Sequence, residues 1–176
     1  MCGFAGFIDR PNRIADPASV MTSMSAAIHH RGPDGEGRSF DESRRIALVH
    51  RRLAIQDPSD AGAQPMRSAS ERFELVYNGE IYDFLELRAE LETLGHRFRG
   101  GSDTEVLLAC FDAWGIEETL RRVDGMFAFA VVDRQEGRLT LGRDQAGQKP
   151  LLLAVAGECI AFASDLRALE VLPDPF

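Results

Sequence analysis

The sequence predicts one α+β domain in which antiparallel sheets are layered with helices. Its 176 residues are enough to bury a single sizeable core. Apolar runs of strand length come in pairs separated by short turns, and they do not alternate regularly with helices. Such pairs favour antiparallel hairpins over a doubly wound parallel sheet. The glycine-rich loops that cradle phosphate groups have no counterpart in the sequence, so we expect no nucleotide site.

The first elements are a strand and a helix. Residues 2–8 are apolar and interrupted by glycine, which predicts a buried strand. A helix is expected over residues 17–28, because Asp16 is a favourable N-cap and Pro17 suits the first helical position. A glycine–proline pair ends this helix, and we expect residues 34–37 to form a loop.

Two strands are predicted next, over residues 45–50 and 72–77. Asn78-Gly79 follows the second of them directly, and both residues tolerate positive φ. This dipeptide is a strong turn signal, so the second strand is expected to end there.

Three helices are predicted in the middle of the chain. Residues 81–94 carry apolar side chains at steps of three and four. Ser102 and Glu105 form a capping box at the start of a second helix, which continues to Trp114. A short third helix is expected over residues 117–122.

The last third of the chain is read as two hairpins and a final helix. Residues 126–133 form a continuous apolar run and residues 138–143 alternate, as expected for paired strands. A second hairpin is predicted over residues 151–155 and 159–163, followed by a helix that Ser164 caps.

Composition and charge limit the classes of function. Hydrophobic residues are 44% and charged residues 27%, which is ordinary for a soluble globular protein. A net charge of -8 argues against nucleic acid or an anionic membrane as main partner. Cys2, Cys110 and Cys159 are odd in number and far apart, which indicates free thiols in a reducing compartment. With no signal-peptide pattern and no apolar stretch that could span a bilayer, we expect a cytoplasmic protein.

Cys2 is the first candidate for chemistry. Methionine aminopeptidases remove Met1 when the second residue is small, and removal leaves a thiol and a free α-amine on one residue. Their ordinary pKa values are about 8.5 and about 7.7–8.0, so near neutral pH the amine can take the thiol proton. This arrangement is the cysteine counterpart of the N-terminal threonine nucleophile. Taken alone, a cysteine at this position is more often an unreactive strand residue than a nucleophile.

Attack on a carboxamide requires further groups. An oxyanion needs preorganised donors, worth about 3–4 kcal/mol each, and the Asn78 side-chain amide and Gly79 N–H are candidates. If the substrate is an amino acid, Arg51 or Arg52 could bind its carboxylate. Asp103 could bind its ammonium group. Spacing in the sequence does not by itself bring these groups together.

Seven blocks, in order along the chain, resemble one enzyme family. The blocks are Cys2-Gly3-Phe4-Ala5-Gly6, His30-Arg31-Gly32-Pro33-Asp34, His50-Arg51-Arg52-Leu53-Ala54-Ile55, Gly62-Ala63-Gln64-Pro65-Met66, Tyr77-Asn78-Gly79-Glu80-Ile81-Tyr82, Ser102-Asp103-Thr104-Glu105 and Gly125-Met126-Phe127-Ala128-Phe129-Ala130. Together they are similar to the glutaminase domain of the asparagine synthetase type, a class II glutamine amidotransferase with an N-terminal nucleophile. The resemblance extends from residue 2 to about residue 169, nearly the whole chain.

The resemblance implies an αββα four-layer sandwich, the N-terminal-nucleophile hydrolase fold, and a set of site residues. By it, Cys2 is the nucleophile and its α-amine the base, while Asn78 and Gly79 form the oxyanion hole. Glu80 and Asp103 hold the α-amino group of the substrate. Its α-carboxylate is assigned to Arg52, with backbone help from Leu53, Ala54, Ile55 and Gln56.

The implied reaction is hydrolysis of the L-glutamine side-chain amide through a Cys2 thioester, giving glutamate and ammonia. By the same resemblance, the ammonia serves an ATP-using synthetase domain or subunit, with asparagine biosynthesis as the default outcome. No metal and no cofactor are expected in this chain, since ATP and Mg belong to the synthetase. A homodimer is left open.

The expected domain covers residues 1–170, and residues 171–176 are a tail or the start of a linker to a synthetase domain that the chain does not contain. The chain is then either an excised domain or a stand-alone subunit. Gln145-Ala146 and Leu151 stand where the family usually has Arg-Phe and Tyr. These departures leave the glutamine site untouched but bear on the fit to a synthetase partner.

Two other interpretations stay open. One is a different N-terminal-nucleophile amidase that cuts an acyl or peptide amide, although Arg52 and Asp103 suit a free amino acid better. The other is a catalytically idle regulatory or interaction module. It would follow if Met1 were retained, because the nitrogen of Cys2 would then be an amide.

Overall fold

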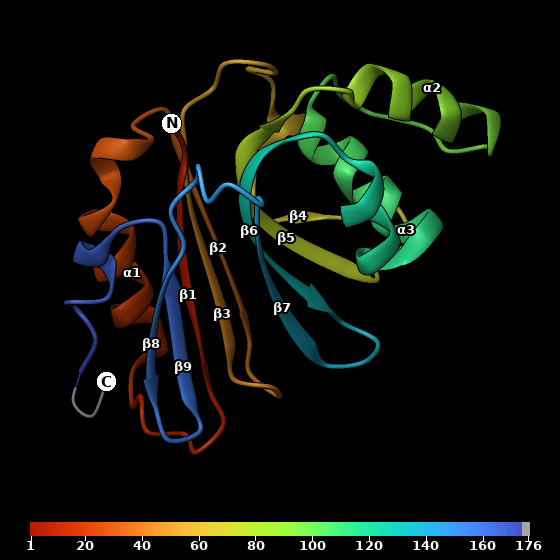
Figure 1. Cartoon of the computed structure of the whole chain (residues 1–176). Helices are drawn as coiled ribbons and strands as arrows, with labels where there is room; N and C mark the ends of the chain where they lie inside the picture. Colours follow the sequence, from red (N-terminus) through yellow and green to blue (C-terminus); the bar gives the residue numbers. More distant parts are fainter. Residues whose placement is uncertain (174–176) are drawn as a thin grey trace.

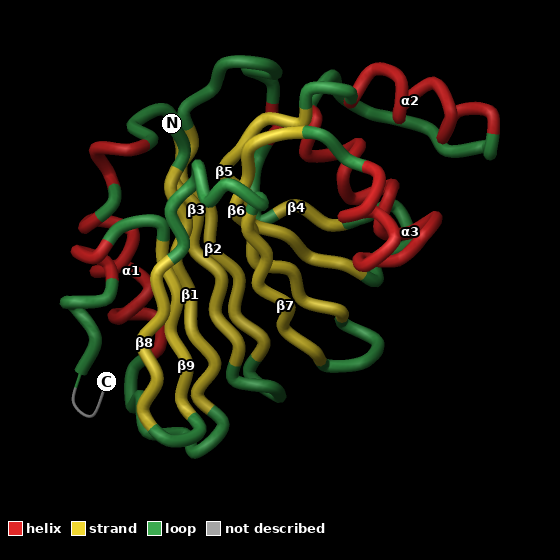
Figure 2. Tube along the Cα trace, viewed as in Figure 1, coloured by secondary structure: helices red, strands yellow, loops and turns green. Residues whose placement is uncertain are grey.

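A computed structural model describes residues 1–173 of the chain. Within this range the chain forms nine strands, three α-helices and three short 3₁₀ helices. Figures 1 and 2 show four layers, in which two sheets face each other and helices cover the outer face of each. Residues 174–176, which belong to the predicted tail, lie outside the described residues.

The first sheet has the strand order β2-β3-β1-β9-β8, and every neighbouring pair is antiparallel. Its strand β1 is central and buried along its whole length, as the apolar sequence predicts. Gly6 is required in β1, because a Cβ there would lie 2.2 Å from the Ala47 carbonyl oxygen. The strands of this sheet are β1 (Gly3–Asp9), β2 (Gly35–Asp41), β3 (Ile46–Arg52), β8 (Leu152–Ala156) and β9 (Cys159–Ala163).

The second sheet is also antiparallel, with the order β4-β5-β6-β7. Its two long strands, β5 and β6, pair over their full length from Phe73↔Asp133 to Ile81↔Gly125. The strands are β4 (Met66–Arg67), β5 (Phe73–Ile81), β6 (Gly125–Asp133) and β7 (Arg138–Arg143).

Helices close the two outer faces. Helix α1 (Pro17–Ala27) packs on the first sheet through Met21 and Met24. Helices α2 (Phe84–Thr93) and α3 (Asp103–Arg122) lie on the side of the second sheet, where Phe111 of α3 packs against Phe73 and Phe129. The 3₁₀ helices are η1 (His29–Arg31), η2 (Asp60–Gly62) and η3 (Leu166–Ala168).

A third apolar cluster fills the space between the sheets. Side chains alternate between the two faces of a strand, so β1 sends Phe4 and Ile8 between the sheets and Ala5 and Phe7 toward α1. Phe162 of β9 joins the inner cluster. The predicted αββα class is therefore confirmed.

Two predictions in the first half of the chain are wrong. Residues 34–37 are not a loop, because β2 begins at Gly35 and pairs with β3. Asn78-Gly79 is not a turn either, since β5 continues through both residues opposite Ala128 and Phe127. In each case, pairing with a neighbouring strand outweighs the local preference of glycine and asparagine for turns.

Helix ends are predicted with mixed success. Asp16 accepts from the Ser19 N–H at 3.0 Å and Ser102 from the Glu105 N–H at 3.3 Å, as expected of N-caps. The predicted second and third helices form the single assigned helix α3, interrupted at Gly115, where φ is 77°. The predicted final helix is only η3, and its N-cap is Asp165 rather than Ser164.

Candidate active site

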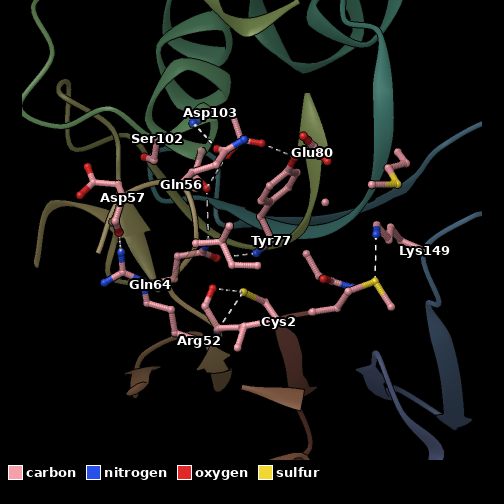
Figure 3. A pocket seen from close by; sticks show the side chains of 18 residues that line it. Cys2, Arg52, Gln56, Asp57, Gln64, Tyr77, Glu80, Ser102, Asp103 and Lys149 are labelled. Carbon is pink, nitrogen blue, oxygen red and sulfur yellow. Dashed lines mark hydrogen bonds between the residues drawn. The ribbon is translucent and has the colours of Figure 1, made fainter. Parts of the chain in front are cut away.

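A cavity of about 200 Å³ opens where β1 begins, and residues far apart in the sequence line it (Figure 3). Contributions come from the N-terminus, the end of β3 with its following loop, the second half of β5 and the start of α3. The lining residues are Met1, Cys2, Arg52, Leu53, Ile55, Gln56, Asp57, Gly62, Gln64, Tyr77, Asn78, Gly79, Glu80, Ser102, Asp103, Thr104, Met126 and Lys149.

Cys2 is half-buried, and both its thiol and its backbone carbonyl form hydrogen bonds. Its Sγ accepts from the Leu53 N–H at 3.3 Å and lies 3.6 Å from the Leu53 carbonyl oxygen. Its own carbonyl accepts from Arg31 Nε at 3.1 Å. Because Gly3 already pairs with Arg51 in the first sheet, the thiol is placed by a strand and not by a free chain end.

Asn78 lines this cavity and carries an unpaired hydrogen-bond donor. The residue is 3% exposed, and its Nδ2 is buried without a hydrogen-bond partner among the described residues. Leaving a buried donor unpaired costs about 1–3 kcal/mol, so such groups are uncommon in folded proteins. This amide can serve an acceptor atom of a bound molecule.

The Gly79 N–H has the same orientation as two backbone donors beside it. The N–H groups of Tyr77 and Ile81 point away from β6, because they donate to Gln64 Oε1 at 2.7 Å and to Asp103 Oδ2 at 3.0 Å. N–H directions repeat every second residue of a strand, so the Gly79 N–H points to the same edge. A Cβ at Gly79 would lie 2.5 Å from the Met126 carbonyl oxygen, which explains the glycine.

Asp103 supplies a buried carboxylate at the first position of α3. The residue is 4% exposed, and its Oδ2 accepts from the Tyr77 hydroxyl at 2.8 Å and from the Ile81 N–H. Its other oxygen accepts from the Thr104 hydroxyl at 3.4 Å. Burial raises the pKa of Asp103, while the bonds from Ile81 and Tyr77 oppose that shift. Oδ1 is thus available to a cationic group.

Neighbouring arginines of β3 point in opposite directions. Arg51 turns toward α1, where it pairs with Glu36 at 2.8 Å and donates to the Ser25 carbonyl at 3.1 Å. Arg52 lines the cavity, where it donates to the backbone carbonyls of Ser59, at 2.8 Å, and Asp57. Of the two candidates, only Arg52 is therefore in a position to meet a ligand.

The histidines are not in this cavity. His50 is fully buried between the sheets, where its Nε2–H donates to the Tyr77 carbonyl at 3.3 Å. Burial lowers the pKa of His50 to about 3, so the ring is neutral at pH 7. Since none of the four histidines lines the cavity, a proton acceptor for the Cys2 thiol has to come from another group.

The cavity brings together nine of the ten predicted site residues. The exception is Ala54, whose N–H donates instead to Asp34 Oδ2 at 2.9 Å. Sequence reasoning overlooked Gln64, Tyr77 and Lys149 as site residues, although Gln64 and Tyr77 stand in blocks that carry the resemblance. No arrangement of His, Cys, Asp or Glu suited to a metal ion occurs in residues 1–173. Nor does any helix in that range have the length and apolar character to span a membrane.

Curated relatives match the chain at moderate identity. A glutamine-hydrolysing asparagine synthetase 1 of Bacillus subtilis is 38% identical over 173 residues, which are 97% of this chain and 27% of the relative. A putative glutamine-hydrolysing asparagine synthetase of Mycobacterium tuberculosis H37Rv is 39% identical over 182 residues, a match that covers 96% of this chain and 28% of the relative. The chain thus spans little more than a quarter of the length of these relatives.

Solved structures agree on the fold. The glutamine phosphoribosylpyrophosphate amidotransferase of B. subtilis, complexed with ADP and GMP, superposes with a TM-score of 0.79 at 22% identity. It covers 97% of this chain, which corresponds to 43% of that chain. The sequence profile described as "Glutamine amidotransferase domain" matches residues 1–175. The chain therefore belongs to the glutamine amidotransferase domain family.

Proposed function

We propose that this domain hydrolyses the side-chain amide of L-glutamine to glutamate and ammonia, with Cys2 as nucleophile. The observation that carries the assignment is the unpaired, buried Nδ2 of Asn78, a residue that lines the same cavity as Cys2. A nucleophile beside a preorganised donor is the arrangement that acyl transfer requires. Membership of the glutamine amidotransferase family supports the choice of amide.

Opposite charges in the cavity suit the two ends of a free amino acid. The Arg52 guanidinium matches an α-carboxylate, assisted by backbone groups of the segment from Leu53 to Gln56. Asp103 and Glu80 carry the negative charge that an α-ammonium group needs. When its α-carboxylate and α-ammonium groups are both bound, the substrate can direct its side-chain amide toward Cys2, Asn78 and Gly79, which line the same cavity.

The reaction then proceeds in two halves. After removal of Met1, the α-amine of Cys2 takes the thiol proton, and the sulfur attacks the amide carbon. Asn78 Nδ2 and the Gly79 N–H donate to the oxyanion. When the intermediate collapses, the α-ammonium gives its proton to the departing nitrogen, which leaves as ammonia and a γ-glutamyl thioester on Cys2. Water, deprotonated by the same amine, attacks the thioester and restores the thiol.

The destination of the ammonia is inferred from the relatives. They are named glutamine-hydrolysing asparagine synthetases, and this chain matches little more than a quarter of each. We infer that residues 1–170 form the glutaminase domain and that a linker begins near residue 171. The ammonia then serves an ATP- and Mg-dependent synthetase domain or subunit that amidates a carboxylate. The default product of that amidation is asparagine. Gln145-Ala146 and Leu151 follow β7 and mark where the fit to that partner is expected to differ.

The test is glutamate release by the purified protein, measured together with its intact mass. We expect loss of Met1 and turnover of glutamine, no turnover by Cys2→Ala, and near-normal turnover by Cys110→Ala, which removes a thiol buried away from the cavity. Equal rates for wild type and Cys2→Ala would refute the proposal. Retention of Met1 in the purified protein would favour an idle module, and preference for an acyl or peptide amide in a substrate panel would favour another amidase.

A further inference from the structure

Lys149 is a buried cation for which the reaction above has no use. It is the single lysine of the chain, whose other 19 basic side chains are arginines. It is 5% exposed and lines the cavity that contains Cys2. Among residues 1–173 it forms no ion pair. Burial of an ammonium group without a carboxylate is costly, so the residue calls for an explanation.

The backbone of Lys149 is held by hydrogen bonds on both its N–H and its carbonyl group. Asp144 lies five residues earlier, and its carboxylate accepts from the N–H groups of Lys149 at 3.1 Å, Gln148 at 2.8 Å and Phe127 at 3.2 Å. Arg143 Nε donates to the Lys149 carbonyl at 2.6 Å. The nearest carboxylate in the sequence is therefore committed to backbone donors, and it holds the lysine in place without pairing with its Nζ.

The Nζ of Lys149 points to the N-terminal end of the chain. Its one hydrogen bond within residues 1–173 is to Met1 Sδ, at 3.0 Å (Figure 3). A thioether is a weak acceptor and does not neutralise an ammonium group. Met1 is also the residue whose removal the proposed function requires. Once Met1 is gone, the ammonium loses this contact and remains in the cavity that Cys2 also lines, where the α-amine of Cys2 is then free.

A fixed positive charge nearby makes both that amine and that thiol release a proton more easily. It disfavours the protonated, cationic form of the α-amine and favours the thiolate over the thiol. Both effects increase the fraction of enzyme with a free base and an active nucleophile near neutral pH. The amine and thiol of Cys2 also experience the other charged or titratable groups around the cavity. These are Arg31, Arg52, Asp57, Tyr77, Glu80 and Asp103.

We propose that Lys149 is a positioning residue that acts through Cys2, keeping the N-terminal amine uncharged and the thiol poised to ionise. The proposal rests on the proposed function for the identity of the mature N-terminus. It also gives a reason for a lysine where the chain otherwise uses arginine, because an ammonium group is a compact point charge and a guanidinium spreads its charge over a planar fork.

The experiment compares wild type with Lys149→Met, an uncharged, unbranched side chain one atom shorter than lysine, and Lys149→Gln, in case the first variant folds poorly. Arg121→Met is the matched control, since it removes one exposed cation from α3. Intact mass is recorded first, so that only protein starting at Cys2 is compared. Two profiles against pH are then measured, kcat/KM for glutamine and the rate of Cys2 alkylation by iodoacetamide without glutamine.

We expect loss of Lys149 to move both profiles upward by about one pH unit, a roughly tenfold loss of rate on the acid side. KM for glutamine and the alkaline plateau should stay within about twofold, and Arg121→Met should match wild type. If wild type hydrolyses glutamine but both lysine variants leave the two profiles unchanged, the role of Lys149 is refuted and the proposed function stands. If the alkylation profile shifts in a protein that does not hydrolyse glutamine, Lys149 acts on Cys2 and the proposed function is refuted.

Discussion

Asn78→Ala is expected to separate activity from stability. The wild-type amide is buried, and its Nδ2 has no partner in the described part of the chain. Its removal eliminates an unpaired donor that costs about 1–3 kcal/mol. The smaller side chain leaves a void, which costs about 1 kcal/mol for a few atoms. The two effects nearly cancel, so the free energy of unfolding should change by less than about 1 kcal/mol.

Activity should respond very differently. Loss of one oxyanion donor lowers kcat by about 10²–10³, equivalent to about 2.7–4 kcal/mol of transition-state stabilisation. The assay is glutamate release at saturating glutamine, paired with urea unfolding of the same samples. Gln64→Leu serves as the contrasting variant, because its Oε1 accepts from the Tyr77 N–H at 2.7 Å. That variant leaves a buried donor unpaired and should lose about 1–3 kcal/mol of stability.

A single result would refute this reasoning. If Asn78→Ala kept kcat within about fivefold of wild type while Cys2→Ala was inactive, the Asn78 amide would not stabilise the oxyanion.

Three further predictions concern neighbouring groups. Arg52→Lys should raise the KM for glutamine by about 10–100-fold, because an ammonium group cannot hydrogen-bond to two loop carbonyls and also bind a carboxylate in bidentate fashion. In the same steady-state assays, Arg51→Lys should leave KM nearly unchanged. Tyr77→Phe should raise KM by about tenfold, and more at acid pH, because the pKa of Asp103 rises further without the hydroxyl; KM measured from pH 5 to 8 tests this. The pKa of His50 is lowered to about 3 in the folded protein, so below about pH 6.5 the unfolded state binds one more proton than the folded state. The free energy of unfolding should therefore fall with decreasing pH, by up to about 1.4 kcal/mol per pH unit. Measured by urea unfolding at several pH values, this dependence on pH should be weaker for His50→Gln.

Local patterns predict most elements but not how strands continue. The hairpins over residues 126–143 and 151–163 were predicted from alternation and apolar runs, and the N-caps Asp16 and Ser102 from residue type. The strand β2 was missed because it is glycine-containing and mostly polar. Its strand character comes from pairing with β3, which a single segment does not encode.

The site shows the same division. From the residues alone, Arg51 and Arg52 were equivalent candidates, and only the alternation of side chains along β3 in the folded sheet separates them. The unpaired amide of Asn78 depends on what surrounds it, so composition and spacing could not reveal it. Lys149 meets Met1 across almost the entire chain, a contact for which periodicity provides no signal.

A chain terminus is usually the first part of a protein to fray. Here the second residue leads directly into β1, which lies between β3 and β9 and is buried along its whole length. The Cys2 thiol is consequently tethered one residue away from a central, buried strand, and we expect it to keep its place while the sheet stays intact. Heating should then abolish turnover only when the whole domain unfolds. Substitutions at Gly6, four residues along β1 from Cys2, should lower turnover because they displace the strand.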